Sequence, residues 1–303
     1  MLLRNFTWWS CRSRNATESG MDRLETCADP DYFRAFAKPV VYTHNRRGFR
    51  DQEWPDTTAQ LSQAVWCFGD SFTVGIGSPR SHTWTYLLEQ ALERRCINVS
   101  QDGQSNEWIA KKIQELTTEI VPQTIIVHWS YTHRRIDPDF DLSRTVNFYW
   151  KQFYNQIKDS TWPADLEFEN FYTLPESVQK EIKQQHYDPE QDRFDFDCVR
   201  PGMYEEDQIV HYVKTTTVEQ DTLNTIACID QVQQMAAQHN INLIHSFVPG
   251  FAPDDQIPTI ESYLSRQGAQ FVPAFDRLDL ARDGHHYDIR TAKYFVQQLI
   301  ELI

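Results

Sequence analysis

The chain has 303 residues, of which 40% are hydrophobic and 24% are charged, so it is long enough to bury a sizeable core and is not a disordered composition. Its formal net charge of −14 argues against a nucleic-acid partner, which would require a basic face, but it leaves a small neutral substrate open. The six cysteines form no CxxC pair and no zinc-type spacing with histidine. We therefore expect neither a metal nor another cofactor.

Residues 1–60 are polar and rich in turn-forming residues, and they predict an irregular lead-in. They contain no sustained hydrophobic region followed by a small-residue cleavage site, and the chain has no run of about 18 apolar residues. The expectation is a protein without a membrane partner that resides in the cytoplasm, or in a virion if the source is viral. The oligomeric state is left open.

Strands and helices then alternate three times along the chain. Short apolar, β-branched runs predict strands over residues 64–68, 96–100 and 124–129, and helical spacing of apolar residues predicts helices over 83–95 and 107–120. Strands that alternate with helices are typical of a parallel sheet with helices on both faces.

The alternation stops over residues 137–215, which are rich in acidic, aromatic and turn-forming residues and are interpreted as an insertion or lid. It resumes with a helix over 218–239, a strand over 241–248, a short helix over 257–267, a weak strand over 269–272 and a closing helix from 289. Five parallel strands predict a flavodoxin-like three-layer α/β/α sandwich over residues 61–303. In such a sheet the ligand site lies beyond the carboxyl ends of the strands.

The stretch "CFGDSFTVGIGS" follows the first predicted strand and raises a choice between a phosphate loop and a nucleophile turn. A phosphate loop needs two glycines separated by four residues and then a lysine, whereas Gly69 and Gly75 are separated by five residues and no lysine follows. The glycine pattern of a dinucleotide-binding fold and the G-x-S-x-G elbow also fail. The remaining candidate in this stretch is Ser71, which lies at a predicted strand-to-helix turn.

A serine becomes a nucleophile only when a base lies within reach and a third group orients that base. The segment "ARDGHHYD" near the end of the chain offers Asp283 and His286, three positions apart. Each residue also has a non-catalytic interpretation that stays open. Ser71 could serve only as a helix N-cap. His285 could be a solvated residue or one that supports its neighbour His286.

These residues resemble the blocks of the SGNH (GDSL-like) hydrolase superfamily, in its carbohydrate-esterase-like branch. The first block matches Gly69-Asp70-Ser71, the second matches "NVSQDGQSN" with Gly103, and the last, D-x-x-H, matches Asp283 and His286. The flanks "NRRGFRDQEW" and "SHTWTYLLEQAL" also look like those of carbohydrate-active members. The match covers most of the chain apart from the insertion.

The resemblance implies that Ser71 is the nucleophile, that His286 is the general base and then the acid, and that Asp283 orients it. It also implies an oxyanion hole built from the N–H groups of Ser71 and Gly103 and from an asparagine side chain after the third strand. In this chain that position is Thr132, whose hydroxyl is shorter than a carboxamide. Gly69 and Asp70 are expected beside the site, with Asp70 hydrogen-bonding its loops.

The leading hypothesis is a serine esterase that removes a small acyl group, most simply acetyl, from a carbohydrate. An O-acyltransferase with the same triad is the first alternative. The second alternative is a glycan-binding or structural module, of the kind found in virions, that keeps the fold without efficient catalysis. Aromatic residues make up 13% of the chain, which suits either a sugar-binding surface or ordinary core packing.

Overall fold

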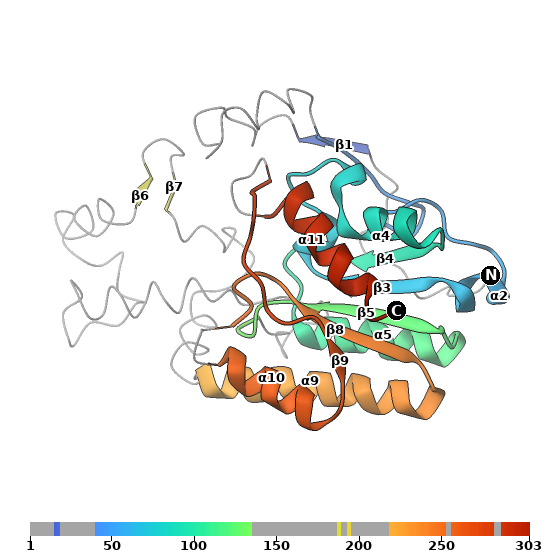
Figure 1. Ribbon diagram of the computed structural model, residues 1–303. Coiled ribbons are helices and arrows are strands. Elements are labelled where there is room, and N and C mark those ends of the chain that lie inside the picture. Colours follow the sequence, from blue (N-terminus) through green and yellow to red (C-terminus); the bar gives the residue numbers. More distant parts are fainter. Residues whose placement is uncertain are drawn as a thin grey trace, which may run out of the picture. The chain divides into compact units, whose positions relative to one another are not determined.

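The computed structural model describes residues 15–18, 40–134, 187–188, 193–194, 218–252, 256–281 and 286–303 (Figure 1). The chain forms two compact units, one made of Met1–Thr132 and Asn224–Ile303 and the other of His133–Leu223. In the second unit, β6 (Tyr187–Asp188) and β7 (Arg193–Phe194) pair in antiparallel fashion. Apart from these two strands, the predicted insertion over 137–215 lies outside the described residues.

The first unit is built on a five-stranded sheet in which every neighbouring pair is parallel, in the order β4-β3-β5-β8-β9. This order matches the flavodoxin-like doubly wound sheet, so the predicted fold class is confirmed. The strands are β3 (Val65–Gly69), β4 (Cys96–Ser100), β5 (Thr124–Trp129), β8 (Asn242–Phe247) and β9 (Gln270–Phe271). Every residue of β3, β4 and β5 is buried, as expected for strands covered by helices on both faces.

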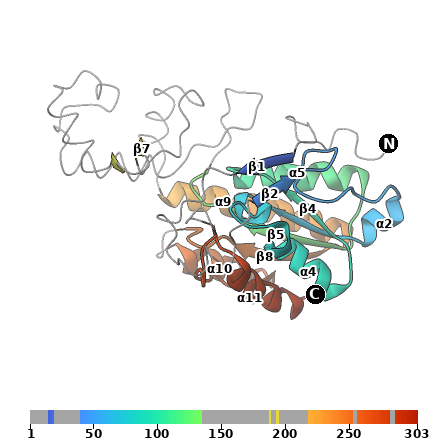
Figure 2. The same cartoon turned by 90° about the horizontal axis from the view of Figure 1, so that it is seen from above.

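Helices cover both faces of this sheet (Figure 1). On one face α4 (Trp84–Leu92) runs beside α11 (Ile289–Ile300), as Figure 2 also shows. The other face carries α5 (Asn106–Glu119), α9 (Val218–His239) and α10 (Ile257–Arg266). The last two are joined by a hydrogen bond of 2.9 Å from the Tyr263 hydroxyl to Asp230 Oδ1. In the part of the chain that is described, no helix combines the length and the apolar character needed to cross a bilayer.

The lead-in differs from the irregular segment that the sequence predicts. β2 (Val40–Thr43) pairs in antiparallel fashion with β1 (Asn15–Glu18), and α2 (Thr58–Gln63) precedes β3. The alternation of buried and exposed residues in β2 extends over four residues only, which is too short to give a clear periodic signal. Phe49 and Trp54 from this segment are buried, and Trp54 packs edge-on against Trp66 of β3 at 5.3 Å. Phe49 and Trp54 of the lead-in are therefore part of the core.

Candidate active site

The turn after β3 places Ser71 at the first position of a short helix, α3 (Ser71–Val74), at the carboxyl edge of the sheet. The residue that caps this helix is Asp70, whose Oδ1 accepts a hydrogen bond of 3.0 Å from the N–H of Phe72. Ser71 is therefore not the N-cap, and the structure removes that alternative explanation for it. Gly75 ends the helix in the left-handed region, with φ of 77°.

Gly69 is required by the close approach of its neighbours. A Cβ atom at this position would lie 2.0 Å from Thr73 Oγ1 and 3.1 Å from the carbonyl oxygen of His128. The first distance is far inside van der Waals contact, so any side chain would push Thr73 out of the turn. The glycine of the first motif block thus lets α3 fold back tightly onto β3.

Arg50, from the lead-in, holds the loop that follows α3. Its guanidinium is buried and donates hydrogen bonds to the carbonyl oxygens of Val74 (3.0 Å), Gly75 and Ser78 (2.7 Å). The guanidinium also stacks on the ring of Tyr42, 4.2 Å from its centroid. The sequence analysis missed this residue, although the segment "NRRGFRDQEW" had been noted as a flank.

The loops after β4 and β5 meet the turn that carries Ser71 at the same edge of the sheet. The N–H of Gln101 donates to the carbonyl oxygen of Gly69 across 3.4 Å, and Gly103 follows with φ of 72°. From the other side, Ser130 Oγ donates a hydrogen bond of 2.7 Å to Asp70 Oδ2. Asp70 therefore joins its own turn to the loop after β5.

A buried asparagine that the sequence analysis did not single out fixes this third loop. Asn106 accepts from the N–H of Ser130 at 2.8 Å and donates to its carbonyl oxygen at 3.0 Å. Thr132, two residues after Ser130, is 1% exposed. Its N–H donates a hydrogen bond of 2.9 Å to the carbonyl oxygen of Phe251. Thr132 thus lies in the loop where the family motif has its asparagine; its contribution to an oxyanion hole stays a prediction.

His286 lies against the turn that carries Ser71. Its side chain is buried, and its ring centroid is 4.6 Å from the ring of Phe72, the residue directly after Ser71. The carbonyl oxygen of His286 accepts a hydrogen bond of 2.7 Å from the N–H of Ala281, which closes the intervening loop. Asp283 and His285 lie in that loop, outside the described residues, so the orienting role of Asp283 also stays a prediction.

The residue after His286 is anchored in the core. The Tyr287 hydroxyl lies 3.3 Å from His128 Nε2, and His128 Nδ1 lies 3.0 Å from Ser246 Oγ. Because Ser246 donates its hydroxyl hydrogen to the carbonyl oxygen of Val127, His128 carries its proton on Nδ1 and accepts from Tyr287 at Nε2. Burial lowers the pKa of His128 to about 3, so the ring is neutral.

Other candidate groups lie apart from this edge or serve the core. The tryptophans in the described ranges (54, 66, 84, 108 and 129) are all buried, which favours core packing over a sugar platform there. Among the described residues, no group of three or more His, Cys, Asp or Glu side chains could hold a metal ion.

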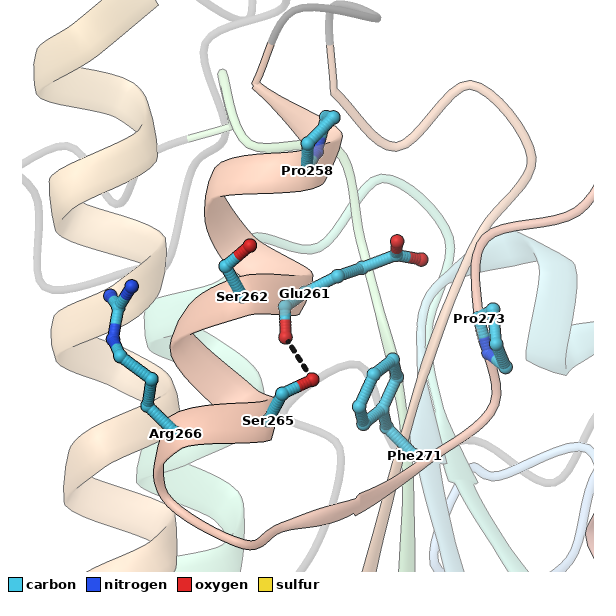
Figure 3. A pocket seen from close by; sticks show the side chains of 7 residues that line it. All are labelled: Pro258, Glu261, Ser262, Ser265, Arg266, Phe271 and Pro273. Carbon is cyan, nitrogen blue, oxygen red and sulfur yellow. Dashed lines mark hydrogen bonds between the residues drawn. The ribbon is translucent and has the colours of Figure 1, made fainter.

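A pocket of about 490 Å³ lies between α10 and β9 (Figure 3). Its lining includes Glu261, Arg266 and Phe271, and the Glu261 carboxylate extends toward Pro273. Oε1 of Glu261 accepts a hydrogen bond of 2.9 Å from the N–H of Ala274. β9 is three strands away from β3 in the sheet, about 14 Å at the usual strand spacing, so this pocket is separate from the Ser71 turn.

No protein-family model and no curated protein matches the chain. Solved structures do resemble it. A lipolytic protein of the G-D-S-L family from Desulfitobacterium hafniense is 10% identical over 80% of this chain and 99% of its own, with a TM-score of 0.42. An acylhydrolase from Bacteroides fragilis is 11% identical over 83% and 96%, with a TM-score of 0.37. An acetyl xylan esterase from Butyrivibrio proteoclasticus is 12% identical over 83% and 67%, with a TM-score of 0.38. We therefore argue function from the residues of this chain.

Proposed function

We propose that this chain is a serine esterase of the SGNH (GDSL-like) superfamily, with Ser71 as nucleophile and His286 as general base. The observation that carries the proposal is the contact between the ring of His286 and that of Phe72, at 4.6 Å. It brings the two motif blocks, which are separated by more than 200 positions in the chain, to one turn. The N-cap of α3 is Asp70, so the Ser71 hydroxyl is not needed to cap that helix.

The reaction would begin with attack of Ser71 Oγ on the carbonyl carbon of the ester while His286 takes the hydroxyl proton. The negative charge that develops on the carbonyl oxygen would be stabilised by the N–H groups of Ser71 and Gly103 and by the Thr132 hydroxyl. His286 would then give its proton to the departing alcohol, which leaves an acyl group on Ser71. A water molecule deprotonated by His286 would release the acid, with Asp283 orienting the imidazole throughout.

The proposed substrate is a small acyl ester, with an acetylated carbohydrate as the preferred class. Support for a small acyl group comes from the burial of the turn, because Ser71 is 1% exposed. Support for a carbohydrate comes from the resemblance of the two flanking segments. The buried tryptophans of the described part add no support for a carbohydrate substrate.

Covalent labelling tests this proposal directly. A fluorophosphonate probe should react with the wild-type chain and with Ser265→Ala, whose hydroxyl lies on α10 and donates to the carbonyl oxygen of Glu261. It should not react with Ser71→Ala, and His286→Gln should slow labelling by about 10³-fold or more. Labelling that persists in Ser71→Ala, or a wild-type chain that is never labelled, would reject the nucleophile.

Product analysis then separates the esterase from its alternatives. With p-nitrophenyl acetate and acetylated xylo-oligosaccharides as substrates, an esterase releases acetate to water. Preferential transfer of acetyl to an added sugar would instead indicate an O-acyltransferase. Binding of the oligosaccharide with no turnover, unchanged in Ser71→Ala, would indicate a glycan-binding module.

A further inference from the structure

Asp288, two residues after His286, occupies the N-cap position of α11 without capping that helix. An aspartate at an N-cap usually accepts hydrogen bonds from N–H groups of the first helical turn. Here those donors are taken by Asp279, which accepts from the N–H groups of Arg290 (2.7 Å) and Thr291 (3.0 Å). The side chain of Asp288 therefore does not cap the first turn of α11.

The carboxylate of Asp288 turns instead toward the segment that follows the nucleophile. Its Oδ1 accepts a hydrogen bond of 2.8 Å from Ser78 Oγ and lies 2.9 Å from His82 Nδ1. The side chain is only 2% exposed, and burial raises its pKa to about 7. Burying a carboxyl group is unfavourable unless its oxygen atoms are bonded, and these two contacts, together with a hydrogen bond from the backbone N–H of Ile289, offset that cost.

Ser78 is linked back to Ser71 by a short series of backbone contacts. The N–H of Ser78 donates to the carbonyl oxygen of Gly75 (3.2 Å), and the N–H of Gly75 donates to that of Ser71 (2.9 Å). Arg50 holds the carbonyl oxygen of Ser78 from the other side, at 2.7 Å. A displacement of Asp288 would therefore be resisted by the same loop that presents the nucleophile.

We propose that Asp288 is a positioning residue, which fixes the segment bearing His286 against the segment following Ser71 through Ser78 and His82. The inference rests on the proposed function of Ser71 and His286 and adds a residue outside the motif blocks. Asp288 acts through the backbone between positions 286 and 288 and does not touch the reacting atoms. A correctly placed base matters because a misplacement of about 1 Å can cost about 10²-fold in rate.

The test compares Asp288→Ala with Asp288→Asn. Both contacts are made by Oδ1, which asparagine retains, so Asp288→Asn should keep most of the activity. Asp288→Ala should lower kcat by 10- to 100-fold with KM changed less than about 2-fold. Asp230→Ala, which removes the carboxylate that accepts from Tyr263 on the opposite face, is the matched control and should keep kcat. Should Asp288→Ala not fold, Ser78→Ala removes the same contact from the other partner and should also lower kcat.

Two results would overturn the inference. One is a folded Asp288→Ala or Ser78→Ala with wild-type kcat. The other is a loss of kcat in Asp288→Ala that follows only its loss of thermal stability and is matched by Asp230→Ala.

A wild-type chain that fluorophosphonate never labels would reject the proposed function, yet the positioning role would still be decided by NMR. With ¹⁵N-labelled histidine, the His286 signals are identified by their loss in His286→Gln. They should shift in Asp288→Ala and not in Asp230→Ala. Unshifted His286 signals in Asp288→Ala would overturn the inference without reference to catalysis.

Discussion

The hydroxyl of Tyr287 donates to Nε2 of His128, a residue 159 positions earlier in the chain, across 3.3 Å. This bond fastens the segment that carries His286 to the middle of the sheet, because His128 belongs to β5. The ring of Tyr287 also lies 5.4 Å from that of Phe72, so the tyrosine contacts the Ser71 turn as well as the core.

Tyr287→Phe should lower the free energy of unfolding by about 1–2 kcal/mol, since it leaves Nε2 of His128 buried without its donor. The ring contact with Phe72 is retained, so the variant isolates the hydroxyl. Urea denaturation measures the change. Tyr263→Phe, which removes a hydroxyl bonded to Asp230 near the surface, should cost less than about 1 kcal/mol. Equal losses in the two variants would mean that the Tyr287 hydroxyl has no special role.

Gly69→Ala should destabilise the protein by about 2–4 kcal/mol and reduce labelling of Ser71, because the new methyl group would displace Thr73 from the turn. Gly268→Ala provides the comparison. That residue has φ of 65° and nothing within 4 Å of a new Cβ atom, so its cost is the backbone strain alone, about 1 kcal/mol. A Gly69→Ala variant no less stable than Gly268→Ala would contradict the close packing of Thr73.

Buried neutral histidines should make the protein sensitive to acid. Burial lowers the pKa of His128 and of His245 to about 3, below the ordinary value of 6.5. The unfolded chain therefore binds protons at a higher pH than the folded chain, and stability is lost as pH falls from about 6.5 toward 3. Each histidine should account for roughly 3 kcal/mol between pH 7 and pH 4.

His245→Gln tests this prediction. Glutamine can still accept the hydrogen bond that Trp129 Nε1 donates to His245 Nδ1 at 3.0 Å. The variant should flatten the fall in stability below pH 6.5, as measured by urea denaturation at several pH values. His239→Gln, at an exposed site at the end of α9, should leave the slope as it is.

Asp288 should change the stability of the fold with pH in the opposite direction to the two histidines. Its pKa is raised to about 7, so the folded state holds the proton more tightly than the unfolded state. Its contribution to stability is present below about pH 4 and is lost as pH rises to 7. Asp288→Asn should remove that part of the slope.

Thr132→Ala tests the altered third block. If the threonine hydroxyl donates to the oxyanion, its loss should lower kcat by about 10²-fold, whereas Thr132→Ser should stay within a few-fold of wild type. The N–H bond of residue 132 to the carbonyl oxygen of Phe251 is kept in both variants. A Thr132→Ala variant with unchanged kcat would exclude the hydroxyl from the proposed oxyanion hole.

The sheet was largely predictable from the sequence. The strands over 96–100 and 124–129 and the helix over 218–239 were predicted with the bounds that the structure has. Their signals are local, since a buried parallel strand is a short apolar run and a long helix repeats its apolar residues every three or four positions. The helix starts at 257 and 289 also agree, and the other strand and helix boundaries shifted by one to three residues, because the ends of helices and strands depend on capping and on neighbouring segments.

The residues that hold the loops around Ser71 could not be predicted from the sequence. Arg50 and Asp288 look like ordinary polar residues in sequence, and each acquires its role from a partner brought near by the fold. Ser78 and Asp288 are 210 positions apart, and no periodicity joins them. Asn106 likewise follows a normal helix cap, Ser105, and nothing local shows that it binds the loop after β5.

The separation in sequence of these contacts also sets the order in which they can form during synthesis. Arg50 reaches its three carbonyl partners across 24, 25 and 28 positions, so the loop behind the nucleophile can close soon after residue 78 has left the ribosome. Asp288 is synthesised 210 residues after Ser78, and it and His286 must find that loop after the last strand of the sheet, β9, has been made. A nascent chain arrested before residue 286 would thus contain the Ser71 turn without the proposed base, His286. We therefore expect reactivity of Ser71 to arise only after residues 286–288 have been synthesised.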